Sequence, residues 1–209
     1  MFEESLIKEA RENLALLGQS GILKDSYLAG GTAAALQLGH RISFDLDFFT
    51  DKDFVPKVFS HELSRLGSFD EEQANKGTVI GIFQGIRFSL FVYKYPLISP
   101  TLKYQSINIA DIRDIGAMKI DAVATRGTKR DFIDLYFISR KIRLENILEL
   151  YNKKYGKLAG NRIHILKSLV YFQDAEEEPM PKMLKQCRWE EVKNFFEQEV
   201  KKLTDKFIQ

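Results

Sequence analysis

The sequence contains little cysteine and little histidine. Cys187 is the single cysteine, so no disulfide can form within the chain and no zinc site can be built from cysteine pairs. The three histidines, His40, His61 and His164, are scattered along the chain without the spacing of metal ligands. Because these absences fit a reducing compartment, we expect a cytoplasmic protein.

Long apolar runs and an excess of one charge are also missing. A membrane span needs about 18 consecutive apolar residues, and the most apolar stretch, residues 27–38, is interrupted by Thr32, Gln37 and two glycines. Residues 1–18 carry too many charges for a secretory signal. Lys and Arg total 31 against 29 Asp and Glu, so the net charge of +2 gives no global positive field that would indicate nucleic-acid binding. We expect no membrane partner.

The pattern of apolar residues predicts mixed helices and strands first and helices alone afterwards. The 209 residues, 44% of them hydrophobic, are enough for a substantial core. Helical spacing and glycine stops predict helices at 4–17, 33–38, 56–66, 109–126, 129–139, 144–155, 161–173 and 189–208, and alternation predicts strands at 43–50, 78–83 and 86–93. We expect an α+β core over residues 1–105, a helical region over 106–209, and an exposed loop at 175–181.

Two carboxylates, Asp45 and Asp47, are the sharpest local feature. On the predicted strand 43–50, alternation places both on one face and the apolar residues, Phe44 among them, on the other. Neighbouring carboxylates repel each other unless a cation lies between them, so a hard divalent ion such as Mg²⁺ is the natural ligand. The alternative is that both are solvent-facing residues of an amphipathic strand.

Gly30, Gly31 and Thr32 directly precede the predicted helix 33–38. A glycine-rich helix start presents free backbone N–H groups and the positive end of the helix dipole to a phosphate. The alternative is a tight turn in which Thr32 caps the helix. A phosphate here and a metal ion at the two carboxylates would support each other.

Taken together, Gly30-Gly31-Thr32 and Arg41-x-Ser43-x-Asp45-x-Asp47 resemble the signature of the DNA polymerase β-like nucleotidyltransferase superfamily. More narrowly, the chain is similar to the AbiEii toxin family, the nucleotidyltransferase component of bacterial abortive-infection toxin–antitoxin systems. The matching segments are 28–33, 38–41, 43–49, 118–122, 126–127 and 129–136, in order and spacing, over about residues 25–140. The combination is far more specific than any one segment.

The resemblance implies a polymerase β-like core completed by a helical C-terminal part, and transfer of a nucleotide from an NTP to an acceptor hydroxyl with Mg²⁺. Asp45 and Asp47 would hold the metal ion and act in catalysis. Lys119, on the predicted helix 109–126, would bring a positive charge to the phosphates. The remaining nucleotide-binding residues would be Gly30, Gly31, Thr32, Arg41 and Ser43.

Two further acidic residues, Asp131 and Asp134, share one face of the predicted helix 129–139. The resemblance implies that one of them lies in the active site. We favour Asp131 as the catalytic group, activating or orienting the acceptor hydroxyl, with Asp134 as a packing partner. The open alternative is that these carboxylates anchor Arg126 and Arg130 in salt bridges.

One position departs from the superfamily pattern. A third carboxylate often comes from a neighbouring strand, where the predicted strand 86–93 has Ser89 instead. Two aspartates can still bind Mg²⁺ through phosphates and water, but a full two-metal mechanism normally uses the third carboxylate for the second ion. Asp131 could substitute for it, and Ser89 could equally be a neutral strand residue.

The resemblance leaves the acceptor open between an RNA 3′ end, notably that of tRNA, and a protein side chain, and it implies a cognate antitoxin as a further partner. Basic residues that could face RNA are Lys129, Arg130, Lys141, Arg143, Lys153, Lys154 and Lys157. A rival interpretation is a non-catalytic nucleotide- or nucleic-acid-binding module with a degenerate transferase site. A metal-dependent phosphoesterase would need more histidine or carboxylate ligands than this chain supplies.

Overall fold

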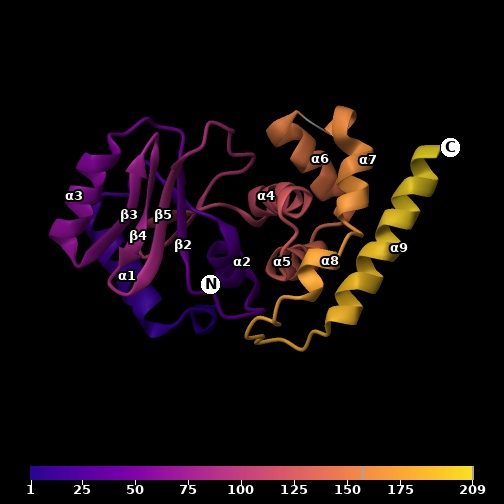
Figure 1. Cartoon of the computed structure of the whole chain (residues 1–209), viewed down its shortest axis with the longest axis horizontal. Helices are drawn as coiled ribbons and strands as arrows, with labels where there is room; N and C mark the ends of the chain where they lie inside the picture. Colours follow the sequence, from indigo (N-terminus) through magenta and orange to yellow (C-terminus); the bar gives the residue numbers. More distant parts are fainter. Residues whose placement is uncertain (157, 209) are drawn as a thin grey trace.

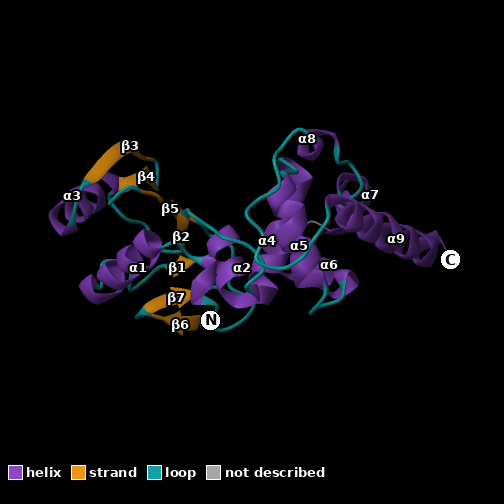
Figure 2. Ribbon diagram, turned by 90° about the horizontal axis from the view of Figure 1, so that it is seen from below, coloured by secondary structure: helices purple, strands orange, loops and turns teal. Residues whose placement is uncertain are grey.

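The computed structural model describes residues 1–156 and 158–208. The chain forms an elongated molecule, with the N-terminal elements at one end and the C-terminal helix at the other (Figure 1). Strands lie in one half and the helices that follow them in the other (Figure 2). The α+β fold with a helical C-terminal part, expected from the sequence, is thus confirmed.

One mixed sheet organises the N-terminal half. Within the described residues it has seven strands in the order β3-β4-β5-β2-β1-β7-β6. The strands are β1 (Tyr27–Leu28), β2 (Leu46–Thr50), β3 (Phe69–Asn75), β4 (Thr78–Phe83), β5 (Ile86–Val92), β6 (Leu102–Tyr104) and β7 (Ile107–Ile109). Strand β2 pairs in parallel with β5 and antiparallel with β1. The strand that carries Asp47 is therefore central in the sheet.

The helices cover both faces of the sheet and build the second half. They are α1 (Lys8–Ser20), α2 (Gly30–Leu38), α3 (Pro56–Leu66), α4 (Ile112–Thr125), α5 (Lys129–Ser139), α6 (Leu144–Tyr155), α7 (Leu158–Ser168), α8 (Gln173–Glu176) and α9 (Trp189–Ile208), after a short 3₁₀ turn at Glu3–Ser5. Helices α1 and α3 lie on one side of the sheet, and α2 lies on the other, next to α4 and α5 (Figure 2). Helix α2 is buried because it packs between the sheet and helices α4 and α5.

Several predicted elements are confirmed within a residue or two at each end. The hairpin of β4 and β5 turns at Gln84 and Gly85, whose φ values of 49° and 77° match the left-handed pair that a two-residue hairpin loop prefers. Side-chain caps explain two helix starts. Asp111 accepts from the backbone N–H of Arg113 before α4, and Thr128 accepts from that of Asp131 before α5.

Other predictions are wrong at their boundaries. Strand β2 begins at Leu46, so Phe44 and Asp45 precede it, and Phe44 is exposed rather than on the buried face. Ile109, predicted to start a helix, ends strand β7, which pairs with β1. The predicted helix 161–173 breaks after Ser168 and resumes only at α8. The strands β3 and β6 were not predicted, because edge strands exposed to water lack apolar alternation.

The division into a core of 1–105 and a helical region of 106–209 stays a prediction. Strand β7 belongs to the sheet, and α4 begins at Ile112. None of the helices in the described part of the chain is both long and apolar enough to cross a membrane.

Gly18 provides a test of the packing of α1. The first helix, predicted to end at residue 17, continues past it, so Gly18 lies inside α1, where an added Cβ would sit 1.9 Å from the backbone carbonyl oxygen of Gln105. Gly18→Ala should lower the free energy of unfolding by about 1–3 kcal/mol through overpacking, although alanine is the better helix former. Urea unfolding measures this, with the exposed neighbour change Gln19→Ala as control. A Gly18→Ala protein as stable as the control would contradict the packing.

Candidate active site

A polar cavity of about 280 Å³ lies where β2, the N-terminus of α2, α4 and α5 meet. Every predicted site residue except Gly30 lines it. The lining residues are Gly31, Thr32, Arg41, Ser43, Asp45, Asp47, Arg87, Lys119, Arg126, Thr128, Arg130 and Asp131. Residues up to 100 positions apart in the sequence, Gly31 and Asp131, thus converge on one site.

The two glycines allow the start of α2 to approach the acidic and basic groups closely. Gly30, with φ of 65°, is the first residue of α2, and a Cβ added there would lie 3.1 Å from Asp47 Oδ2. A Cβ on Gly31 would lie 2.3 Å from Arg41 Nη2. Only glycine leaves this space, so the free N–H groups of the helix start face the cavity beside Asp47 and Arg41.

Thr32 and Ser43 fix the segment that carries the first aspartate. Thr32 Oγ1 lies 2.9 Å from Ser43 Oγ and also hydrogen-bonds to the backbone carbonyl of Asp45. Ala29, and not Thr32, occupies the cap position of α2. The alternative interpretation of Thr32 as a helix cap is therefore wrong, and its hydroxyl instead holds Asp45 against the start of α2.

Asp45 and Asp47 both line the cavity and are close enough to interact electrostatically. Asp47 pairs with Ser89 across β2 and β5, and the Ser89 hydroxyl donates to Asp47 Oδ1 at 2.6 Å. The Asp45 side chain is 41% exposed, with Arg130 Nη1 at 3.9 Å from its Oδ2. Burial and the neighbouring Asp47 raise the pKa of Asp45, which Arg130 only partly opposes. A cation between these two carboxylates would relieve that repulsion.

The donor set fits a hard cation held by only two protein side chains. Among the residues that the structure describes, no group of three or more His, Cys, Asp or Glu side chains is placed to hold a metal ion. Ser89 stands where a third carboxylate would project beside Asp47, and its hydroxyl is committed to that aspartate. Two carboxylates suit Mg²⁺, which keeps several waters and takes further ligands from phosphates.

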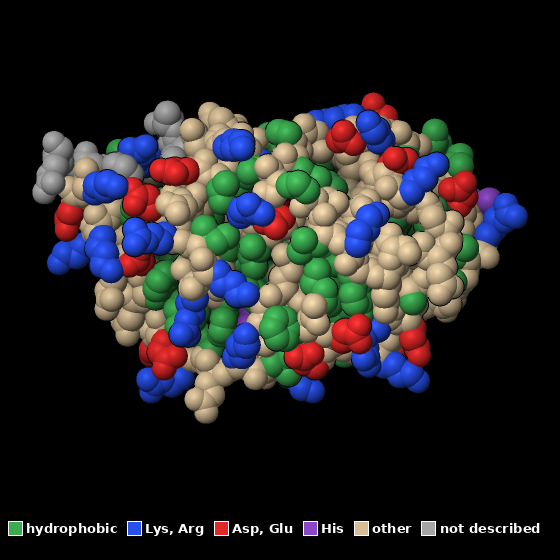
Figure 3. Space-filling model, turned by 180° about the vertical axis from the view of Figure 1, so that it is seen from behind, with side chains coloured by type: hydrophobic (Ala, Val, Ile, Leu, Met, Phe, Trp, Pro, Cys, Tyr) green, Lys and Arg blue, Asp and Glu red, His purple; other side chains and the backbone are tan. Residues whose placement is uncertain are grey.

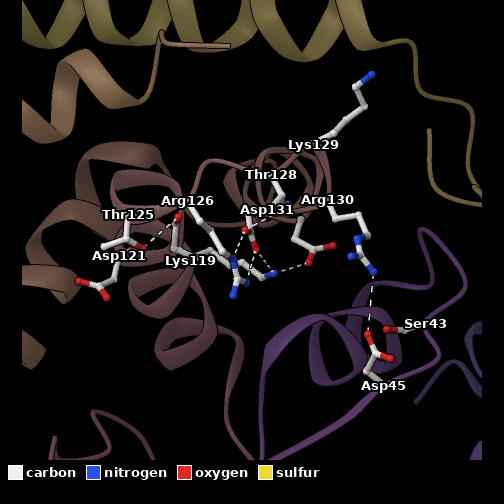
Figure 4. Close-up of polar contacts among 12 residues, drawn as sticks. Ser43, Asp45, Lys119, Asp121, Thr125, Arg126, Thr128, Lys129, Arg130 and Asp131 are labelled. Carbon is white, nitrogen blue, oxygen red and sulfur yellow. Dashed lines mark hydrogen bonds and ion pairs between the residues drawn. The ribbon is translucent and has the colours of Figure 1, made fainter. Parts of the chain in front are cut away.

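Asp131 lies at the inner wall of the cavity and is saturated with hydrogen bonds (Figure 4). It accepts from Lys119 Nζ at 2.8 Å, from Arg126 Nε at 2.7 Å and Nη2 at 3.0 Å, and from Thr128 Oγ1 at 2.7 Å. Burial alone would raise the pKa of Asp131, but Lys119 and Arg126 outweigh it and hold the pKa well below its ordinary value. Asp131 is therefore ionised at neutral pH.

Asp134, one turn further along α5, is fully buried behind the cavity. It binds Arg41 through Nε at 2.7 Å and Nη2 at 2.9 Å, Lys119 Nζ at 2.7 Å and His40 Nε2 at 2.8 Å. Burial would raise the pKa of Asp134, but Arg41 and Lys119 more than offset it and the pKa is well below its ordinary value. This carboxylate ties α5 to both α4 and the core segment at 40–41.

Lys119 connects the two buried carboxylates. Lys119 is 5% exposed, and its ammonium group contacts both Asp131 and Asp134. Burial would lower the pKa of Lys119, but the two aspartates outweigh it and raise the pKa, so the amine stays charged. Lys119 lines the cavity, with its charge shared between two anionic partners.

Four cavity residues were not assigned to the site from the sequence. Arg126 and Arg130 were considered only as salt-bridge or RNA-facing residues, and Arg87 and Thr128 had no role. Figure 4 shows Arg130 reaching from α5 towards Asp45. Two of them could have been assigned from the sequence. Arg126 lies two helical turns after Lys119 on the same face of the helix, and Arg87 lies two positions before Ser89 on the same strand.

The predicted RNA-facing strip is only partly at the surface. Lys129 is buried with its amine at the carbonyl of Glu178, and Lys154 is buried against Asp114 at 2.9 Å, so these two predictions are wrong. Arg130, Lys141, Arg143 and Lys153 are exposed, and Lys157 lies outside the described residues. Figure 3 shows, on one face, basic side chains interspersed with acidic ones rather than a continuous basic surface.

The fold is that of nucleotidyltransferases. MenT4, a nucleotidyltransferase toxin from Mycobacterium tuberculosis H37Rv, superposes with a TM-score of 0.59 at 17% identity, over 92% of this chain and 85% of that chain. A putative nucleotidyltransferase from H. pylori superposes with a TM-score of 0.56 at 19% identity, over 94% of each chain. At these identities the similarity establishes the fold.

The sequence defines the family within that class. Residues 92–207 match the family described as nucleotidyl transferase AbiEii toxin of type IV toxin–antitoxin systems. An uncharacterised protein of Aquifex aeolicus (strain VF5) is 42% identical over 202 residues, covering 94% of this chain and 96% of the relative. The chain belongs to the AbiEii nucleotidyltransferase toxin family, which confirms the resemblance noted in its motifs.

The buried ion network predicts a large cost for neutralising Asp134. Asp134→Asn should lower the free energy of unfolding by about 3–5 kcal/mol, because it leaves Arg41 buried without its bonded counter-charge and removes one of the two anionic partners of Lys119. Urea unfolding at pH 7 measures the change. The matched control is Glu12→Gln, which breaks the exposed Lys8–Glu12 pair and should leave stability nearly unchanged. Equal stability of both variants would contradict the network.

The same network predicts loss of stability in acid. The pKa values of Asp131 and Asp134 are lowered by folding, so their stabilisation is complete above the unfolded value of about 3.9 and is lost as the pH falls below about 4. Burial also lowers the pKa of His40, which adds loss below about pH 6.5. Urea unfolding from pH 7 to 3 should show a steeper decline below pH 4 in the wild type than in Asp134→Asn. If the stability of the two proteins fell in parallel with pH, Asp134 would not be a source of the loss in acid.

Proposed function

We propose that this protein is a Mg²⁺-dependent nucleotidyltransferase toxin that moves a nucleotide from an NTP to an acceptor hydroxyl. The observation that carries the proposal is the cavity that joins Asp45 and Asp47 to the start of α2 and to a set of basic side chains. Among the described residues lining it, five are basic and three are acidic. An excess of positive charge beside two carboxylates suits a metal-bound triphosphate.

The chain's own groups divide into two sets in this proposal. Asp45 and Asp47 would hold Mg²⁺, which, when bound, neutralises charge on the phosphates as pyrophosphate leaves. The N–H groups at Gly30 and Gly31, with Arg41 behind them, would bind phosphate oxygens. Arg87 and Arg126 also line the cavity and would orient the triphosphate. Lys119 would supply a fixed positive charge at the inner wall.

The transfer itself is a displacement at the α-phosphorus. The acceptor oxygen forms a bond to the α-phosphorus, the bond from that phosphorus to the pyrophosphate oxygen breaks, and the proton of the acceptor hydroxyl passes to solvent water. Asp131 accepts four hydrogen bonds and has a lowered pKa, so it is a poor proton acceptor. We assign to Asp131 the positioning of Lys119 and Arg126 within the catalytic machinery.

The partners follow from the family and the charge of the site. The family description places its members in type IV toxin–antitoxin systems, so we expect a cognate antitoxin. For the acceptor we favour an RNA 3′ end, such as that of tRNA, over a protein hydroxyl, because Arg130 and three other basic residues of the predicted strip are exposed on the helical half. Since an NTP and such an RNA would be the substrates, we expect the reaction to take place in the cytoplasm.

The rival is a binding module that holds a nucleotide without transferring it. Ser89 in place of a third carboxylate is the feature that favours this rival. The two aspartates, the start of α2 and the charged Lys119 all support an active transferase, since a module that only binds needs no paired carboxylates. Only a transfer assay separates the two.

The carboxylate pair provides that assay. The purified protein is incubated with Mg²⁺, each α-labelled NTP in turn and total bacterial RNA, and the RNA and protein products are separated. Changing Asp45→Asn together with Asp47→Asn should reduce label transfer by at least about 100-fold, because the metal ligands lose their charge. The matched control is Asp51→Asn with Asp53→Asn, an exposed pair of the same spacing just after β2.

The outcomes are distinct. Label that is lost in the Asp45/Asp47 variant and kept in the Asp51/Asp53 variant supports the transferase and names both donor and acceptor. NTP binding without label on any acceptor favours the binding module. Undiminished transfer in the Asp45/Asp47 variant would exclude the metal assignment.

A further inference from the structure

A second hollow of about 390 Å³ opens directly beside the active-site cavity. It shares two walls with that cavity, Arg41 and Arg130. Its other walls are Ile42 and Phe44 from the segment before β2, and the loop residues Glu178, Pro179, Met180, Pro181 and Lys182 from the far end of the chain. We call this hollow the Phe44 pocket.

The Phe44 pocket exposes an aromatic ring and a flexible apolar side chain to water. Phe44 is 47% exposed and Met180 is 39% exposed. Phe44 immediately precedes Asp45, whereas its apolar neighbours Leu46 and Phe48 are fully buried. A large aromatic side chain left in solvent next to a carboxylate pair gains nothing for the core, so its exposure suggests a partner that covers it.

The loop wall of the Phe44 pocket is held in place by backbone hydrogen bonds. Ile42 donates its N–H to the carbonyl of Lys182 at 2.8 Å, and Leu184 donates its N–H to the carbonyl of His40 at 2.9 Å. The carboxylate of Glu178 accepts from the backbone N–H of Lys129 at 2.9 Å. The pocket is therefore preformed, and its one acidic side chain is already engaged.

Two cations remain at the rim of the Phe44 pocket. Arg130 reaches from α5 towards Asp45, where its distance of 3.9 Å leaves the guanidinium free to contact a further anion. Lys182 is exposed and forms no ion pair within residues 1–156 and 158–208. An aromatic face flanked by two cations is the combination with which proteins bind single-stranded nucleic acid, by stacking a base and pairing its phosphate.

We propose that the Phe44 pocket binds the terminal nucleotide of a single-stranded RNA acceptor. Its base stacks on Phe44 against Met180, and its phosphate lies between Arg130 and Lys182. Because Arg41 and Arg130 line both the Phe44 pocket and the active-site cavity, the terminal ribose then lies towards the carboxylate pair. This inference rests on the proposed transferase function and adds to it the site where the acceptor is held.

The occupant is assigned from charge and position. The phosphates of a donor NTP are accounted for by the start of α2 and the cavity arginines, whereas Lys182 lies outside that cavity and matches a phosphodiester further along a strand. A protein acceptor would not need two cations beside an aromatic face. Stacking is also tolerant of sequence, because every base has a π-face.

The test separates acceptor binding from donor binding. For Phe44→Ala, Phe44→Trp and Lys182→Ala, label transfer is measured against RNA concentration, and NTP affinity is measured independently with a fluorescent NTP. Phe44→Ala should raise KM for RNA by about 5- to 100-fold with unchanged NTP affinity, and Phe44→Trp should restore it. Lys182→Ala should raise KM and reduce its dependence on salt. Val58→Ala, an exposed apolar change on α3, is the control and should match the wild type.

Three results would overturn the proposal: an unchanged KM for RNA in Phe44→Ala, weakened NTP binding as its main effect, or label found on protein and not RNA. If the wild type transfers no label, the proposed function fails on its own account. Binding of a labelled single-stranded RNA oligonucleotide then still tests whether the Phe44 pocket binds RNA. Weaker binding by Phe44→Ala than by Val58→Ala supports it, and equal binding refutes it.

Discussion

The contact of the Lys119 ammonium group with Asp131 and Asp134 is the interaction on which the rest of this structure depends. It joins α4 to α5, and Asp134 extends the join to Arg41 in the core. Buried charges are tolerated only when each has a partner, so removing one member leaves others uncompensated. The same ions that hold the two halves together also form the inner wall of the cavity, and stability and site geometry therefore cannot vary independently.

The outer side of the cavity is organised by the sheet. Parallel pairing of β2 with β5 sets Asp47 beside Ser89, and the hydrogen bond between Thr32 and the Asp45 carbonyl fixes the residue just before the strand. The carboxylates consequently share the cavity with the start of α2 and with three largely exposed arginine side chains, Arg87, Arg126 and Arg130.

The sequence predicted what depends on local pattern, and failed where distant contacts decide. The β4–β5 hairpin, α3 and α5 follow from turn residues, caps and periodicity, and the paired aspartates were identifiable from spacing and resemblance. Lys129 and Lys154 looked like surface lysines, because their buried partners, Glu178 and Asp114, are far away in the chain. Phe44 looked buried because strict alternation was extended past the true start of β2.

The return of the chain from α8 to the core has a kinetic consequence. Met183 forms an antiparallel β-bridge with Arg41, and the carbonyl of Lys182 accepts from the backbone N–H of Ile42. Backbone pairing therefore holds the segment after α8 against the segment that precedes the two aspartates. Many transferases admit substrate by swinging two lobes apart about a hinge. Here the backbone pairs of Arg41 with Met183 and of Ile42 with Lys182 would have to break before the two halves could separate, so these pairs oppose such an opening.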